Sequence, residues 1–583
     1  MKSRFISKII IVILISLSIG LIYIYPDLRF ILELKNEFKG ITLTATHDEL
    51  GYLARIKAVY KGNPACRGID LYEHRDALWT QPFLCELVEG SIGRLLKINV
   101  SRLDIIMSFF LPVILFWLIF ILLMKLSDSK ICSFLGAGSI VLGYSVFTAM
   151  PVVILKDILV THNFSEPLWF LRPISPQFNH VVFILALVMI YSAVTHKKKK
   201  AIFFSAFFTG ALFYIHHHYW TYIYAGLFIL SLFFFVTGSK GSLKTVLLII
   251  AWSLFLSLPF WLHAYKIRLS PNYLDALNFA GLINTHQPIL PVFHLALSAG
   301  IIITLWFLKD ANIIFITAFL AGGILCLNQQ IVTGITMIPG HWQGYTNKTF
   351  LIIALAYVLF RIITRSINSD NRYSLRLFYT SLASIIVIFF YSLGFIQQNN
   401  YYYANKEKMR QRQAISGAYG WINRNAKNTD VVLTDPYNYL LGKSPFNFEV
   451  LTYTNCYTYL PMIYSSLLSK DEFEYRILAA LRFFNYPKAG LDSYLSRANG
   501  TYLLGLQVLP DYGNNPISLT EVERIKTRYT SLLNLDAFTA LKKYKVDYVV
   551  VENKSLPGYG MFFKTNKLTL VYRDDEFSIL KIA

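Results

Sequence analysis

Apolar residues in this sequence occur in long runs that are separated by polar segments. Most runs have the length of roughly 20 residues that an α-helix needs to cross a bilayer. The pattern therefore predicts a polytopic α-helical membrane protein with about eleven transmembrane helices. The predicted spans lie at about 9–25, 103–124, 131–155, 179–195, 201–215, 219–236, 245–263, 290–308, 311–327, 349–364 and 375–396.

One apolar run, residues 201–236, is too long for a single crossing. We divide it at the histidines 216–218, which gives two spans joined by an outward-facing hairpin. A single span would put the four lysines at 197–200 and the lysines at 240 and 244 on opposite sides of the membrane. Cytoplasmic loops carry an excess of Lys and Arg, so the charge pattern favours the division.

Two long segments are polar, and they define the predicted domains. Residues 1–396 form a transmembrane domain with a large first outer loop at 26–102, and residues 397–583 form a soluble extracytoplasmic domain. In the second domain, DVVLTDP (430–436), VDYVVVEN (546–553) and LTLVYRDDEFSILKI (568–582) read as strands, and FTALKKYK (538–545) reads as a helix. The order of helix and strand predicts a small α/β domain.

Composition and charge also limit the class of protein to which this chain can belong. Hydrophobic residues make up 55% of the 583 residues and charged residues only 15%, which excludes an ordinary soluble protein. The net charge of +21 does not indicate a nucleic-acid partner, because more than half of it falls in predicted cytoplasmic segments. No small-residue cleavage site follows the first span, so we expect an uncleaved span in the inner membrane with a cytoplasmic N-terminus.

The first outer loop opens with an acidic pair. Asp48 and Glu49 follow His47 and begin an amphipathic segment that ends at Gly62, Asn63 and Pro64. Such a pair can be a solvated helix start, because carboxylates are favourable at a helix N-terminus. Alternatively, it supplies a general base or a metal-binding carboxylate, which leaves open a divalent metal bound by His47 and Asp48. No other cofactor is indicated.

The second half of this loop, WTQPFLCELVEGSIGRLLKI (79–98), is amphipathic and is expected to lie along the membrane surface. Glu86 and Glu89 would then face away from lipid, toward the site. Cys66 and Cys85 share the loop, where thiols oxidise, so we expect a disulfide between them. Two buried free thiols are the alternative.

Cationic and imidazole side chains mark three further outer loops. Arg172 is either an interface anchor or a phosphate ligand. His341 and Lys348 accompany aromatic residues in NQQIVTGITMIPGHWQGYTNKTF (328–350), which suits sugar or headgroup contacts or an aromatic belt. His216 and His218 form a polar cap or bind a metal; at most two of three consecutive histidines are expected to ligate one ion. No Walker lysine loop, GxSxG or HExxH motif is present.

These segments together resemble the GT-C superfamily of integral-membrane glycosyltransferases. HDELGYLARIKAVYKGNP is similar to the opening of the first loop in the protein mannosyltransferase and aminoarabinose transferase branch, and WTQPFLCELVEGSIGRLL is similar to the surface helix that follows it. RPISPQFNH and NQQIVTGITMIPGHW resemble loops of bacterial members. The resemblance covers the layout of roughly the first 400 residues.

The resemblance implies a glycosyltransferase that takes a sugar from a polyprenyl-phosphate donor and transfers it, with inversion, to a glycan, lipid or protein acceptor at the outer membrane face. Asp48 takes the place of the catalytic carboxylate of the family, and Glu49 that of its neighbour. Arg172 and Lys348 are expected, by location, to bind the carrier phosphate. Further substrate-binding candidates are His341, His216, His218 and Glu86.

The sequence also departs from the family pattern. Gln81 precedes Pro82 where a basic residue is usual, which weakens a donor-phosphate contact there. The C-terminal domain lacks a Trp-Trp-Asp motif, which disfavours N-glycosylation of sequons. The alternative functions are a transporter or flippase of lipid-linked saccharides, which predicts charged groups deep within spans, and an O-antigen-type polymerase or ligase, whose large loop usually comes late in the chain.

Overall fold

The computed structural model describes residues 2–44, 46–366, 372–436, 446–462, 467–495, 519–554 and 567–583. The chain forms two compact units, each assembled from three separate segments. The first unit comprises residues 1–35, 102–261 and 285–407, and the second comprises 36–101, 262–284 and 408–583.

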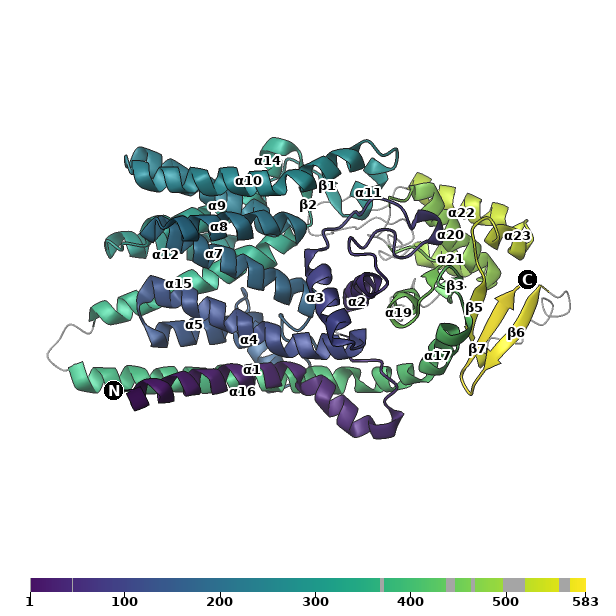
Figure 1. Ribbon diagram of the computed structural model, residues 1–583, viewed down its shortest axis with the longest axis horizontal. Coiled ribbons are helices and arrows are strands. Elements are labelled where there is room, and N and C mark those ends of the chain that lie inside the picture. Colours follow the sequence, from purple (N-terminus) through teal and green to yellow (C-terminus); the bar gives the residue numbers. More distant parts are fainter. Residues whose placement is uncertain are drawn as a thin grey trace. The chain divides into compact units, whose positions relative to one another are not determined.

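The first unit is a bundle of apolar helices, and each of the predicted spans coincides with a helix or a bent pair of helices (Figure 1). This confirms the polytopic α-helical fold. The helices are α1 (Lys2–Leu34), α4 (Val100–Ser127), α5 (Lys130–Gly143), α6 (Pro151–Leu159), α7 (Asn179–His196), α8 (Lys199–Ala211), α9 (His217–Val236), α10 (Lys240–Arg268), α12 (Val292–Phe307), α13 (Ile313–Leu327), α15 (Lys348–Ser366) and α16 (Arg372–Arg412).

Fewer of these helices are long enough to cross a membrane than the sequence pattern predicts. In the described part of the chain, 8 helices have the necessary length and apolar character, or 9 if the α5–α6 pair, bent by 86°, is one broken span. The helices α8 and α12 are shorter, with 13 and 16 residues. Large apolar side chains on α10, among them Trp252, Phe255 and Leu258, are exposed, as lipid-facing residues would be.

The break between α8 and α9 lies where the sequence predicts it. A short 3₁₀ turn, η5 (Leu212–Tyr214), ends the first helix, and His216 is extended, with φ −162° and ψ 138°. The ring of His216 accepts a hydrogen bond from the backbone N–H of His218 and so caps the start of α9. The division of the run 201–236 is therefore confirmed.

Small residues allow two central helices to approach closely. The helix α9 packs against α13, and a Cβ atom added at Gly322 would lie 2.7 Å from the backbone nitrogen of Gly226. Close approach at small residues is how helices associate in membranes, where burial of apolar surface does not drive packing. A larger residue at Gly322 would force α9 and α13 apart.

The second unit contains a five-stranded sheet, and its predicted strands are confirmed. The strand order is β4-β3-β5-β7-β6; β3 is parallel to β4 and β5, and β7 is antiparallel to β5 and β6. The predicted turn at Asp574 and Asp575 separates β6 from β7. The strands are β3 (Val431–Leu433), β4 (Tyr457–Thr458), β5 (Tyr548–Glu552), β6 (Leu568–Arg573) and β7 (Phe577–Ile582).

Helices cover both faces of this sheet. Alternate residues of one strand point to opposite faces, and Val549 and Val550 of β5 accordingly belong to different apolar clusters. The cluster of Val549 includes residues of α20 (Lys470–Phe483), α22 (Leu519–Leu533) and α23 (Ala537–Leu541), and that of Val550 includes residues of α17 (Ser416–Asn425) and α19 (Phe446–Tyr453). The predicted helix before β5 is α23.

The first loop folds as part of the second unit. It forms α2 (His47–Tyr60) and α3 (Leu84–Leu96), and α2 packs against both α3 and α19. The predicted boundary at residue 397 is close to residue 407, where the first unit ends on α16, and the compact units group the first loop with the C-terminal segment. The remaining elements are α11 (Tyr273–Phe279), β1 (Leu282–Asn284), α14 (Gln330–Thr333), β2 (Ile335–Met337) and α21 (Lys488–Leu495).

Candidate functional site

Both predicted phosphate ligands, Arg172 and Lys348, lie among aromatic rings in the first unit. The Nη2 atom of Arg172 donates to the hydroxyl of Tyr345 at 3.5 Å. The Nζ atom of Lys348 lies 4.4 Å from the ring centre of Tyr144 and 5.9 Å from that of Trp169. The Trp169 ring is 5.4 Å from Tyr144 and 5.5 Å from Tyr345. We call these five residues the cation–aromatic cluster.

A buried histidine, His180, links the helices behind this cluster. Its Nδ1 atom is 2.9 Å from the hydroxyl of Tyr219 on α9, and its Nε2 atom is 3.1 Å from the carbonyl oxygen of Tyr345 and 3.2 Å from the hydroxyl of Thr349 on α15. His180 itself is in the first turn of α7 and is fully buried. The first turns of α7, α9 and α15 therefore meet at one place, which sequence reasoning did not identify.

This arrangement gives the cluster a positive electrostatic character. Of these three helices, only α9 starts here after an extended residue, because α7 and α15 continue the π-helical segments η4 (Pro173–Phe178) and η6 (Trp342–Asn347). The N-terminus of α9 contributes a partial positive charge. Arg172 and Lys348 add two formal positive charges, and Lys348 has no carboxylate partner within 4 Å among the described residues. The cluster can therefore bind an anion such as a phosphate.

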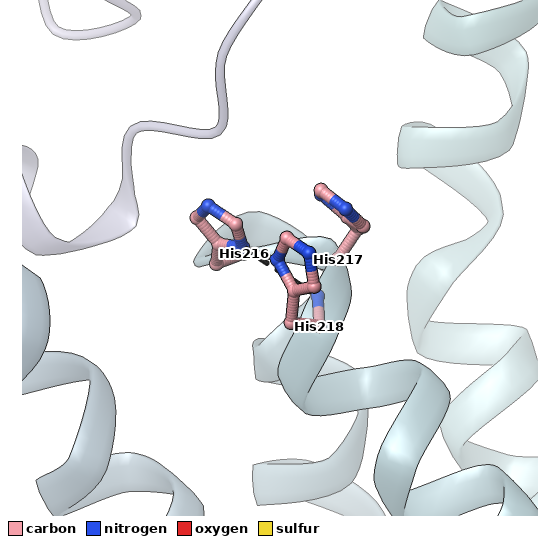
Figure 2. Close-up of side chains that lie close together, drawn as sticks. All are labelled: His216, His217 and His218. Carbon is pink, nitrogen blue, oxygen red and sulfur yellow. Dashed lines mark hydrogen bonds between the residues drawn. The ribbon is translucent and has the colours of Figure 1, made fainter. Parts of the chain in front are cut away.

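Four imidazoles lie next to one another in the same unit (Figure 2 shows three of them). The Nδ1 atoms of His216 and His218 are 2.8 Å apart, and one ring nitrogen from each of the residues His216, His217 and His218 lies within 4.8 Å of the others. The ring of His341 is centred 4.9 Å from that of His218. Burial lowers the pKa of His216 to about 4. Burial, then His216 and Arg172, lowers the pKa of His341 to about 3.

The predicted catalytic carboxylates lie in the second unit, at the start of α2. The structure confirms that Asp48 and Glu49 occupy the first turn of a helix, where negative charge is favourable. Asp48 is exposed, whereas Glu49 is only 4% exposed. The side chain of His47 lies outside the described part of the structure. Asp48 is thus the member of the pair whose carboxylate reaches solvent.

The carboxylates of α3 differ from this pair because both are buried. Glu86 binds the Nε atom of Arg55 at 2.6 Å, and each side chain is 4% exposed. Glu89 is fully buried, and neither of its carboxyl oxygens has a hydrogen-bond partner among the described residues. Burial, and secondarily the charge of Glu86, holds the pKa of Glu89 well above its usual range. Glu86 pairs with Arg55, and its contact with substrate stays a prediction.

The predicted disulfide is wrong. Cys66 and Cys85 are both free and buried. The thiol of Cys66 donates to the carbonyl oxygen of Arg55 at 3.4 Å and packs among apolar residues. Burial raises the pKa of Cys66 to about 12 and holds that of Cys85 well above its usual range. Oxidation proceeds through the thiolate, which this environment disfavours.

No protein-family model and no curated protein matches the sequence. Among solved structures, the chain is similar to ArnT from Cupriavidus metallidurans bound to undecaprenyl phosphate, with a TM-score of 0.48 and 8% identity over 99% of this chain and 98% of that one. It is also similar to ArnT from the same organism in the apo state, with a TM-score of 0.43 and 10% identity over 91% and 93% of the two chains.

Proposed function

We propose that this protein is a membrane glycosyltransferase that moves a sugar from a polyprenyl-phosphate donor to an acceptor. The observation that carries the proposal is the cation–aromatic cluster, where Arg172 and Lys348 lie among aromatic rings. The cluster belongs to a bundle of apolar helices. A ligand suited to both features has an anionic group and a long apolar tail, which describes a polyprenyl phosphate.

The charge of Lys348 supports a role in binding the donor. Its ammonium group lies against the ring faces of Tyr144 and Trp169. A cation–π contact, unlike an ion pair, does not neutralise the cation, so protonated Lys348 can still attract an anion. Arg172 offers further N–H donors in the planar arrangement that matches phosphate oxygens. Aromatic rings beside a phosphate also suit the apolar face of a sugar.

The positive-inside rule places this cluster at the extracytoplasmic face. The helix α7 begins at Asn179, next to His180, and ends at His196, before the lysines at 197–200, and α8 with η5 leads back toward His216. The lysines are therefore at the opposite ends of α7 and α8 from the cluster. Because lysines of short loops stay in the cytoplasm, the cluster faces the other side. The N-terminus is then cytoplasmic if α1, α4 and the α5–α6 pair each cross once.

We assign the role of general base to Asp48. The base removes the proton from the acceptor hydroxyl or amine while the acceptor atom bonds to the anomeric carbon of the sugar. The bond from that carbon to the phosphate oxygen breaks, and polyprenyl phosphate leaves with the bonding electrons. One displacement of this kind inverts the anomeric configuration. A divalent metal bound at Asp48 is the alternative role for this carboxylate.

Reconstituted protein tests the proposal directly. The purified chain in proteoliposomes is incubated with a panel of undecaprenyl-phosphate monosaccharides and a mixed acceptor pool of glycan, lipid A-type lipid and peptide. We expect free undecaprenyl phosphate to appear in step with a glycosylated acceptor, as measured by mass spectrometry. Movement of the intact lipid-linked sugar across the bilayer, with no cleavage of any panel member, would support the flippase and overturn the transferase.

A further inference from the structure

The histidines at the start of α9 form a group that the proposed phosphate chemistry does not use. His216, His217 and His218 lie close together (Figure 2), and each places a ring nitrogen within 4.8 Å of the other two. The ring of His341 lies beside that of His218. This proximity arises because His216 is extended while the helix begins at His217, so the rings of His216 and His218 turn toward each other. A continuous helix would direct residues i and i+2 to different faces.

Hydrogen bonds to the backbone fix which nitrogen of His218 carries the proton. The Nε2 atom of His218 is 3.1 Å from the carbonyl oxygen of Met337 and 3.2 Å from that of Ile338. Carbonyl oxygens only accept, so Nε2 donates, and the neutral ring presents a lone pair at Nδ1. An N–H that donates to a backbone carbonyl is the arrangement that orients metal-binding histidines.

The Nδ1 atom of His216 presents a second lone pair at the same place. It lies 2.8 Å from Nδ1 of His218, and it also accepts from the backbone N–H of His218 at 3.5 Å. If neither Nδ1 atom carries a proton, two lone pairs face each other and no hydrogen bond can form between them. A metal ion would satisfy both lone pairs at once, and at His216 it would replace the weak 3.5 Å bond from the backbone N–H of His218.

Two more ring nitrogens nearby lack partners. The Nε2 atom of His217 and the Nδ1 atom of His341 are buried, with no hydrogen-bond partner among the described residues. A buried polar nitrogen without a partner is costly, and native structures contain few of them. The group of histidines therefore holds more unmatched nitrogen lone pairs than hydrogen bonding within the protein explains.

We propose that His216, His217 and His218 bind one divalent transition-metal ion of the zinc class, with His341 beside them as a further ligand. Imidazole suits Zn²⁺, Cu²⁺ and Ni²⁺, whereas Mg²⁺ and Ca²⁺ prefer oxygen ligands, and no carboxylate belongs to this group in the described structure. Zinc–nitrogen bonds are about 2.0–2.1 Å long, so the rings rotate from the present spacing when the ion binds. The ion would tie the start of α9 to the segment that holds His341, independently of the proposed glycosyl transfer.

Metal titration of the purified chain tests the site. The full-length protein, made without a polyhistidine tag and stripped by a chelator, is titrated in detergent with Zn²⁺ and, separately, with Co²⁺. We expect one equivalent to bind, and the Co²⁺ form to show the visible absorption of a tetrahedral nitrogen-ligated ion without thiolate charge transfer. Wild-type protein that binds no Zn²⁺ at neutral pH would overturn the proposal, whatever the variants do.

Two variants locate the site. His216→Ala combined with His218→Ala should weaken Zn²⁺ binding at least 100-fold. His196→Ala, which changes an exposed histidine at the far end of α7, is the matched control and should bind like wild type. Retention of the Co²⁺ spectrum in the folded double variant would show that the ion binds elsewhere and would contradict the assignment.

Discussion

The cation–aromatic cluster of the first unit and the acidic start of α2 in the second unit are opposite in charge. The cluster combines Arg172 and Lys348 with aromatic rings, whereas α2 begins with Asp48 and Glu49. Each region matches one requirement of glycosyl transfer from a lipid phosphate. Cations bind the leaving phosphate, and a carboxylate accepts the proton of the nucleophile. Phosphate binding and proton transfer are therefore assigned to different residues. Substitutions can then change donor affinity and turnover separately.

A second difference lies among the carboxylates of the second unit itself. Asp48 is exposed, Glu86 is engaged by Arg55, and Glu89 is buried with a raised pKa. A base that meets an acceptor must be accessible to it. Among these three side chains, Asp48 fits that requirement best.

Removing the charge of Asp48 is the change with the largest expected effect. Asp48→Asn keeps the size of the side chain and removes its basicity, so turnover should fall by about 10²- to 10⁴-fold. Release of undecaprenyl phosphate measures the turnover. Glu49→Gln, at the buried neighbour, is the control and should retain most activity. Turnover near the wild-type rate in folded Asp48→Asn would remove Asp48 from the chemistry.

Two substitutions on α3 compare a paired with an unpaired buried carboxyl. Glu86→Gln leaves the guanidinium of Arg55 buried without its counter-charge, and it should lower the free energy of unfolding by about 3–5 kcal/mol. Glu89→Gln replaces a buried carboxyl that balances no cation among the described residues and whose pKa is raised by burial, so it should cost about 1 kcal/mol or less.

Thermal unfolding of both variants in the same detergent measures this difference. The two positions lie one helical turn apart on α3, so each variant serves as the control for the other. Equal loss of stability in both would mean that Glu89 is ionised or that Arg55 does not depend on Glu86.

The smallest effect concerns pH and the pair of His74 and Glu472 in the second unit. The Nε2 atom of His74 is 3.1 Å from both carboxylate oxygens of Glu472, and this hydrogen bond raises the pKa of His74 above 6.5. Because the folded pKa is the higher one, the stabilisation is fully present below pH 6.5 and is lost as pH rises through the folded pKa. The loss should be about 1 kcal/mol or less.

Melting temperatures between pH 6 and pH 8.5 check this prediction. Wild type should lose some stability over this interval, and His74→Gln should lose less, because its side chain does not titrate. A steeper decline in His74→Gln than in wild type would contradict the assignment of the charge to His74.

Much of the fold could be predicted because hydropathy and strand patterns are local. The break at His216 and the strands around Val549 and Ile579 lie where the sequence places them. Helix ends were harder to predict, because α16 continues through the polar segment after residue 396 to Arg412. An apolar run marks the part of a helix that can lie in the membrane, but it does not mark the residue at which the helix ends. The assembly of the second unit from three segments depends on contacts distant in sequence, such as that of α2 with α19.

The sequence identified several candidate residues of the site but not how they are arranged in space. Arg172 and Lys348 are distant in sequence, yet both join one aromatic cluster. His180 was missed because a single histidine at the start of a span gives no signal of its own, although it ends the quoted motif RPISPQFNH. The disulfide was expected from the compartment alone, and burial of Cys66 and Cys85 depends on packing that a loop sequence does not reveal.

Direct binding of the carrier tests the central claim, that the cation–aromatic cluster binds a polyprenyl phosphate. Titration of undecaprenyl phosphate into the purified chain, followed by native mass spectrometry, compares wild type with Arg172→Gln, Lys348→Gln and Asp48→Asn. Charge-assisted hydrogen bonds contribute about 1.5–3 kcal/mol, so each cation variant should raise the dissociation constant by about 10- to 100-fold. Asp48→Asn should change it by no more than about 2-fold, since the base is assigned no contact with the phosphate. Wild-type affinity in both cation variants, or weakening in Asp48→Asn as large as in Arg172→Gln, would contradict the account.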